Sequence, residues 1–226
     1  VTNYFGLMSL FFIYAYLREL RFKFLFLFLS VLSLYLSALG GARGEFIVAL
    51  ILYFICAMVM RFSWLKVVGL GVLFFIFYII IDYYLMDSFV LLRRFGALFD
   101  GDFSTRDVLA YQSLTLLYDN PLCLISGCGL GYFQSYYNYP VSLYPHNFIL
   151  EFLISYGLIV FILFFSMTSY GFYKFYRYNG RFTLMHLVTV YFFLISMKSG
   201  YLIGSWFLFV LLITFSAFSL KKTPYV

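Results

Sequence analysis

Seven long apolar runs, each bounded by charged or turn-forming residues, divide the chain. They cover residues 2–17, 22–39, 46–60, 67–81, 148–173, 182–197 and 202–220. A helix needs about 20 apolar residues to cross the hydrocarbon core of a bilayer, and a shorter run can cross if its bounding charges lean toward the surface. The pattern therefore predicts about seven transmembrane helices and an all-α polytopic membrane protein.

The composition indicates the same class. Of the 226 residues, 65% are hydrophobic and 11% are charged, and the mean hydropathy is +0.97. A soluble domain has about 45–50% apolar and about 25% charged residues, so this chain has too little polar surface to face water. These values exclude a soluble enzyme, a nucleic-acid-binding protein and a disordered chain. Three cysteines are also too few for a disulfide scaffold.

One hydrophilic stretch separates the runs into three predicted regions. Residues 1–81 are expected to form four transmembrane helices, 82–147 an extracytoplasmic loop with an amphipathic helix, and 148–226 three transmembrane helices. Ten basic residues fall on the side of the C-terminus, namely Arg18, Arg21, Lys23, Arg61, Lys66, Lys174, Arg177, Arg181, Lys221 and Lys222. The loop side has five, namely Arg43, Arg93, Arg94, Arg106 and Lys198. Because cytoplasmic loops are rich in Lys and Arg, this asymmetry predicts a cytoplasmic C-terminus.

Seven helices with this orientation place the N-terminus outside, and the chain begins with Val1. We therefore expect the C-terminal part of a longer protein, truncated at its N-terminus. A start codon read as valine is the alternative that the topology leaves open.

The loop contains a predicted helix over residues 105–117, which should stop before Pro121 and lie on the membrane or on the bundle. Arg106 is in its polar first turn. This arginine can pair with Asp102 or Asp107 as an ordinary surface residue, or it can bind a phosphate.

A glycine-spaced turn and two cysteines follow. Gly127, Gly129 and Gly131 resemble a nucleotide-binding loop only superficially, because no strand precedes them. They are expected to allow a tight turn or a close backbone approach. Cys123 and Cys128 could form a local disulfide, but the sequence favours two small buried thiols.

Tyrosines crowd the segment that returns to the membrane. They are Tyr132, Tyr136, Tyr137, Tyr139 and Tyr144. An interfacial aromatic belt is one interpretation, and a platform for the apolar faces of sugar rings is the other. The two interpretations are compatible.

The sequence Pro145-His146-Asn147 precedes the fifth run, and Glu151 lies in its first turns. His146 is a candidate general base at the membrane surface, although an interfacial histidine that donates to a backbone carbonyl is an equal alternative. Glu151 gains from the helix dipole and needs no catalytic role to explain it. His186, the other histidine, is expected to be structural.

Further basic residues occupy the same predicted face. Arg43 lies in a turn of small residues, 40–45, between the second and third runs, where a guanidinium could hold a phosphate through two hydrogen bonds. Arg93 and Arg94 are weaker candidates for contact with phosphate or head groups. The acidic residues of the loop lack a tight Asp-x-Asp spacing, so neither a metal site nor a cofactor is predicted.

Together these motifs resemble the C-terminal region of bacterial O-antigen ligases and of O-antigen or capsular polysaccharide polymerases. The similar elements are Ala42-Arg43-Gly44, Arg106, Asn120-Pro121, Gly127-x-Gly129-x-Gly131-Tyr132-Phe133, Pro145-His146-Asn147, Glu151, Gly157 and Ser199-Gly200. The resemblance runs from about residue 30 to the end of the chain, and the order of the motifs is more specific than any one of them.

The resemblance implies a multi-span membrane glycosyltransferase of GT-C-like architecture in the bacterial inner membrane. Its donor would be a glycan on a polyprenyl-pyrophosphate carrier, and its protein partners could include a chain-length regulator and a flippase. The positions it implicates in catalysis are Arg43, Arg106 and His146. We add a predicted substrate-binding set of Glu151, Asn147, Arg93, Arg94 and Tyr132.

Three functions remain open. The high Phe and Tyr content favours a polymerase of lipid-linked repeat units over a ligase that transfers the glycan to lipid A core. A transporter or flippase for the same lipid is the alternative from another class. It would need polar residues along a path through the membrane, and the middle third of each predicted span has no ionisable residue. A non-catalytic fragment would also explain the short chain.

Overall fold

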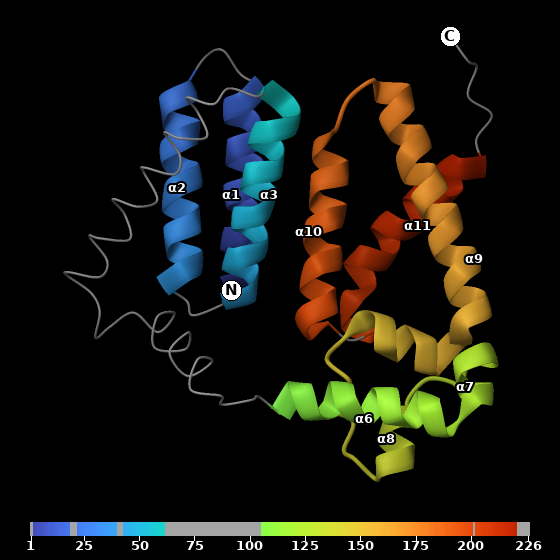
Figure 1. The fold of residues 1–226 in the computed structure, drawn as a ribbon. Helices are drawn as coiled ribbons and strands as arrows, with labels where there is room; N and C mark the ends of the chain where they lie inside the picture. The colour runs from blue at the N-terminus through green and yellow to red at the C-terminus, as the bar shows by residue number, and fades with distance from the viewer. Residues whose placement is uncertain (1, 19–21, 40–42, 62–104, 201, 221–226) are drawn as a thin grey trace. The chain divides into compact units, whose positions relative to one another are not determined.

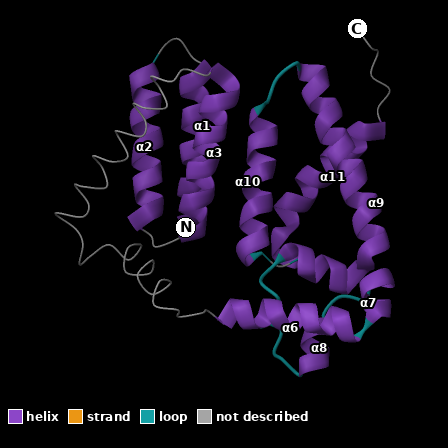
Figure 2. Ribbon diagram, in the orientation of Figure 1, coloured by secondary structure: helices purple, strands orange, loops and turns teal. Residues whose placement is uncertain are grey.

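The computed structural model describes residues 2–18, 22–39, 43–61, 105–200 and 202–220. All regular elements in these residues are helices (Figure 2). They fall into two compact units, one within residues 1–102 and one within 103–226. The fourth predicted run, 67–81, lies outside the described residues.

The first unit contains α1 (Thr2–Arg18), α2 (Lys23–Leu39) and α3 (Arg43–Arg61), which correspond to the first three apolar runs. Figure 1 shows these three helices side by side, with α1 packed on both others. The Ser30 hydroxyl joins them, because it donates to the Ser9 carbonyl at 2.7 Å and shares a hydrogen bond of 2.6 Å with the Tyr53 hydroxyl. A buried hydroxyl between apolar helices needs such partners.

The second unit contains α9 (Phe148–Asn179), α10 (Leu184–Ser199), a short 3₁₀ turn η2 (Ile203–Ser205) and α11 (Trp206–Leu220). In the described part of the chain, α9 alone is long and apolar enough to cross a membrane, whereas α10 and α11 are among the shorter apolar helices. Phenylalanines pack between these helices, including Phe148, Phe152 and Phe165. The backbones of α9 and α11 also meet at Gly171, where a side chain would collide with the Phe215 carbonyl.

The helix α9 is broken at Gly157, whose φ of 78° and ψ of 172° are not helical. Figure 1 shows the segment before the break turned away from the direction of the rest of α9. The predicted fifth run is thus one apolar stretch in sequence but two helical segments in space.

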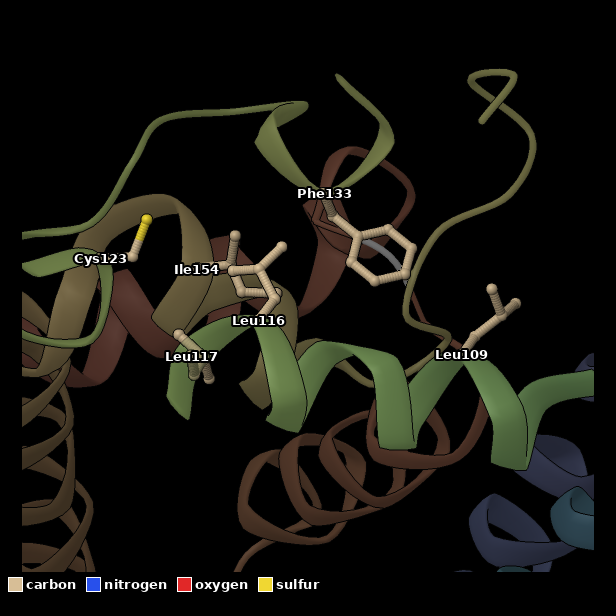
Figure 3. Close-up of a cluster of buried hydrophobic side chains, with 6 residues drawn as sticks. All are labelled: Leu109, Leu116, Leu117, Cys123, Phe133 and Ile154. Carbon is tan, nitrogen blue, oxygen red and sulfur yellow. The ribbon is translucent and has the colours of Figure 1, made fainter. Parts of the chain in front are cut away.

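The loop forms α6 (Thr105–Asp119), α7 (Pro121–Ser126) and α8 (Tyr132–Tyr137). The predicted helix over 105–117 is confirmed, and it packs on the first segment of α9. A buried cluster holds these pieces together, with side chains from α6, α7, α8 and the start of α9. Figure 3 shows its six residues: Leu109, Leu116, Leu117, Cys123, Phe133 and Ile154. Within this unit, the loop helices, the start of α9 and the α10–α11 turn lie at one end, and the α9–α10 turn lies at the other (Figure 1).

Candidate active site

The start of α9 is fixed by Asn147. Its backbone is extended, and its side-chain oxygen accepts hydrogen bonds from the amides of Ile149 at 3.0 Å and Leu150 at 3.2 Å. Asparagine is among the preferred residues for this cap because it satisfies amides that have no partner within the helix. Asn147 is one of the predicted substrate-binding residues, but its side-chain oxygen is used by the cap. The cap also fixes the backbone next to His146.

His146 directly precedes this cap and adopts a left-handed backbone with φ of 54°. It is half-buried, and its ring lies 4.0 Å from the ring of Tyr144, measured between centroids. Its Nδ1 atom is buried and hydrogen-bonds to none of the described residues. Burial, and then the positive charge of Arg106, lower the pKa of His146 below its ordinary value of 6.5. At neutral pH the imidazole is thus uncharged and can accept a proton.

Arg106 is exposed in the first turn of α6 and lies close enough to His146 for its charge to act on the imidazole. The packing of α6 on the first segment of α9 produces this proximity. Two of the three predicted catalytic residues therefore lie within electrostatic range of each other. Asp102, one of the two predicted partners of Arg106, lies outside the described residues.

The side chains of the other predicted arginines lie outside the part of the chain that the structure describes. Arg43 is the first residue of α3, in the first unit, and its side chain lies outside the described atoms. Arg93 and Arg94 lie outside the described residues. Their roles stay predictions.

Glu151 is half-buried one turn into α9, and its Oε2 atom accepts a hydrogen bond from the Leu202 amide at 2.9 Å. Leu202 immediately precedes η2, so this carboxylate ties the start of α9 to the connection between α10 and α11. A typical hydrogen bond inside a protein contributes about 0.5–1.5 kcal/mol. The predicted role of Glu151 in substrate binding is untested, and the structure assigns it this structural bond.

The tyrosines divide into two groups. The Tyr137 hydroxyl donates to the Gln112 carbonyl at 3.0 Å, and the Gln112 amide donates to the Tyr139 hydroxyl at 2.9 Å. These two side chains therefore attach α8 and the turn after it to α6. Tyr136 is exposed, and its ring lies 5.9 Å from that of half-buried Tyr132. Tyr144 packs against His146 instead. A sugar platform of these tyrosines stays a prediction.

Cys123 and Cys128 form a disulfide, so the prediction of two buried thiols is wrong. Cys123 is buried in α7, whereas Cys128 is exposed. The helix ends at Gly127, whose amide donates to the Cys123 carbonyl at 2.9 Å, and the chain then turns back. This turn brings the two Cα atoms to 5.0 Å, within the range of about 4.4–6.8 Å that a disulfide requires.

The glycine turn packs directly on the break in α9. A Cβ atom on Gly127 would lie 2.5 Å from the Ser155 carbonyl oxygen, and one on Gly157 would lie 2.5 Å from the Ile125 carbonyl oxygen. Both glycines have φ of 78°, which side chains rarely allow. The predicted close backbone approach is confirmed. The other glycine of this contact, Gly157, lies inside an apolar run, where a glycine is equally compatible with a straight helix.

Two amides of this turn compensate for the break. The Cys128 amide donates to the Ile154 carbonyl at 2.7 Å, and the Gly129 amide donates to the Ser155 carbonyl at 3.1 Å. These carbonyls would otherwise lose their partners where the helix unwinds. The disulfide-closed turn therefore supports the α9 segment that begins next to His146.

Replacing Cys123 and Cys128 together by serine is expected to lower the free energy of unfolding by about 2 kcal/mol, because a bridge between residues five apart restricts only a short loop of the unfolded chain. Thermal unfolding of the purified protein, with and without a dithiol reductant, measures the effect. The doubly substituted variant serves as the control, since the reductant should not change its unfolding. An equal response of both proteins to the reductant would contradict the prediction.

Comparison with known families agrees with this arrangement. The model of the O-antigen ligase family matches residues 24–165, which is more than half of the chain and includes Arg106, the glycine turn, His146 and the break in α9. No curated protein and no solved structure matches the chain. The chain therefore belongs to the O-antigen ligase family, which makes it a membrane protein of O-antigen ligase or polymerase type.

Proposed function

We propose that this protein polymerises lipid-linked oligosaccharide repeat units on the outer face of the bacterial inner membrane. In this reaction the growing glycan leaves its polyprenyl-pyrophosphate carrier and is joined to a hydroxyl of the next repeat unit. The observation that carries the proposal is a half-buried His146, with a buried Nδ1 atom, within electrostatic range of the cationic Arg106 where a helix long enough to span the membrane begins.

Each of the two residues meets one chemical need of glycosyl transfer. Cleavage of the bond between sugar and pyrophosphate develops negative charge on the leaving group, and the guanidinium of Arg106 can stabilise it in a partly desolvated site. The attacking hydroxyl loses a proton, which the neutral imidazole of His146 can accept. Direct attack on the sugar predicts inversion of configuration. Arg43, Arg93 and Arg94 are proposed as further phosphate contacts.

Two features support an outer location of the loop. The Cys123–Cys128 disulfide favours an oxidising compartment. Lys174, Arg177 and Arg181 lie on the last turns of α9 and just after it, at the end of the unit opposite the loop helices. Basic residues concentrate on the cytoplasmic side of membrane proteins.

The description of the family favours a second function, a ligase that transfers the finished glycan to lipid A core. Cells that lack the chain distinguish the two. Loss of a polymerase leaves single repeats on the core and on outer-face carrier lipid, whereas loss of a ligase leaves the core bare and long glycans on the carrier. Accumulation of carrier-linked repeats on the cytoplasmic face would contradict both and indicate a transporter.

The rate of transfer should stay constant from alkaline pH down to about pH 6.5 and fall only at lower pH. Neutral His146 is the active form in the proposed reaction, and burial together with Arg106 lowers its pKa, so protonation begins at a lower pH than for an ordinary histidine. The pH dependence of kcat/KM in proteoliposomes measures the pKa of His146 in the free enzyme. A midpoint above pH 6.5 would contradict the assignment of His146 as the base.

A further inference from the structure

The short helix α7 carries an exposed apolar surface. We define this α7 surface as Leu122 and Ile125, together with Tyr118 at the end of α6. Their side chains are 78%, 48% and 86% exposed, respectively. The opposite side of α7 is different, because Cys123 is buried in the core of the loop. The packing of the loop on α9 therefore leaves the other side of α7 uncovered within this unit.

The α7 surface is continuous with the apolar exterior of α9. The Ile125 carbonyl lies against Gly157, where α9 breaks, and Figure 1 shows α7 beside this part of α9. Exposed apolar side chains begin immediately after the break: Leu158, Ile159, Val160, Ile162 and Leu163. Since α9 has the length and composition of a membrane-crossing helix in a membrane protein, these side chains are suited to contact acyl chains. The α7 surface would therefore lie at the membrane depth where the exposed side of α9 begins to contact lipid.

Several polar groups of α7 are paired within the helix or absent. The Ser126 hydroxyl donates to the Leu122 carbonyl at 2.8 Å, so it needs no water. The Leu124 amide donates to the Asn120 carbonyl at 3.3 Å, and Pro121 has no amide hydrogen. Internal pairing of this kind lowers the cost of placing backbone and hydroxyl groups in hydrocarbon.

The distribution of charged residues indicates how deep the α7 surface lies in the membrane. Residues 120–150 contain no Asp, Glu, Lys or Arg. The charged residue nearest to α7 in the sequence is exposed Asp119, at the last residue of α6, beside Tyr118. A tyrosine next to a carboxylate is suited to the head-group level, where aromatic side chains collect at membrane interfaces. Leu122 and Ile125 would then lie just below that level.

We propose that the α7 surface inserts into the lipid leaflet on the side of the loop and anchors the glycine turn there. Its occupant is the acyl chains of that leaflet. The anchor fixes the depth of Gly127, and through the contact with Gly157 it fixes the depth at which α9 breaks. This inference rests on membrane insertion of α9 and not on the reaction proposed for His146 and Arg106.

Depth-dependent fluorescence quenching tests the proposal on the full chain in liposomes. Trp64 and Trp206 are first replaced by phenylalanine, and a single tryptophan is then introduced as Leu122→Trp. Lipids brominated in the upper acyl chain should reduce its emission about twofold or more, because an interfacial helix buries its apolar face about 5–10 Å into this boundary. Leu163→Trp, on the exposed side of α9, is the positive control.

The matched negative control is Val141→Trp. Val141 is 87% exposed in the turn after α8, so it resembles Leu122 in exposure but lies outside the α7 surface. It should be quenched by an aqueous quencher and not by brominated lipid. If Leu122→Trp behaves like Val141→Trp, the α7 surface faces water and the proposal is overturned. If its emission is blue-shifted and responds to neither quencher, protein covers the surface, either the first unit or a second copy, and the proposal is overturned as well.

Discussion

Replacement of His146 by asparagine is expected to reduce glycan transfer by about 10²–10⁴-fold while leaving the protein folded. Asparagine tolerates the left-handed backbone that His146 adopts with φ of 54°, so the variant removes the imidazole without adding much strain. It cannot accept a proton near neutral pH. Initial rates in proteoliposomes with a purified carrier-linked repeat unit measure the loss, and thermal unfolding of the same samples reports on the fold.

Asn138 provides a control for the backbone. It lies in the same loop and has the same φ of 54°. Asn138→Ala and His146→Ala therefore introduce the same kind of strain, but only the second removes an imidazole beside Arg106. We expect Asn138→Ala to keep a normal rate. A rate for His146→Asn within tenfold of the unmodified protein would remove His146 from the proposed mechanism.

Most of the helices could be predicted from sequence because each coincides with a long apolar run, a local signal that does not depend on partners. The first three runs coincide closely with α1, α2 and α3, and the last three with α9, α10 and α11. Their ends are marked by charges or caps such as Asn147. Where a helix is defined by a long apolar run and local capping, the linear pattern is sufficient.

The short helices α7 and α8 were not predicted because helices of six residues are not stable alone. They exist because Cys123 and Phe133 are buried against α6 and Ile154. The disulfide was misjudged for the same reason, since the bridge depends on a turn after α7 that the spacing of two cysteines does not reveal. Tertiary contacts determine α7, α8 and the disulfide, and the sequence does not show which residues make these contacts.

The candidate site was only partly accessible to sequence reasoning. His146 and Arg106 were selected from the order of motifs, while their proximity follows from the packing of α6 on α9. Glu151 was expected to bind substrate, but its bond to the Leu202 amide could not be foreseen because the two residues are far apart in the chain. The break at Gly157 was also hidden, because a single glycine in an apolar run is compatible with a straight helix.

Alanine at Gly157 is expected to destabilise the protein by about 2–6 kcal/mol, the sum of about 1–3 kcal/mol for an unfavourable left-handed backbone and about 1–3 kcal/mol for overpacking. Its Cβ atom would collide with the Gly127 amide nitrogen and lie 2.5 Å from the Ile125 carbonyl oxygen. These are backbone atoms, which cannot rotate away as a side chain could. Thermal unfolding in detergent and the amount of protein recovered from membranes measure the loss.

Two other glycines separate collision from strain. Gly129 and Gly180 also have positive φ, of 95° and 61°, but a Cβ atom on either would meet nothing within 4 Å. Gly129→Ala and Gly180→Ala should therefore cost only about 1–2 kcal/mol, from the backbone alone. Equal costs for Gly157→Ala and Gly129→Ala would show that the backbone contact with Gly127 does not hold the break. If the costs differ as expected, the folded fraction of Gly157→Ala should also transfer glycan more slowly, because the shifted break moves the helical segment capped by Asn147, next to His146.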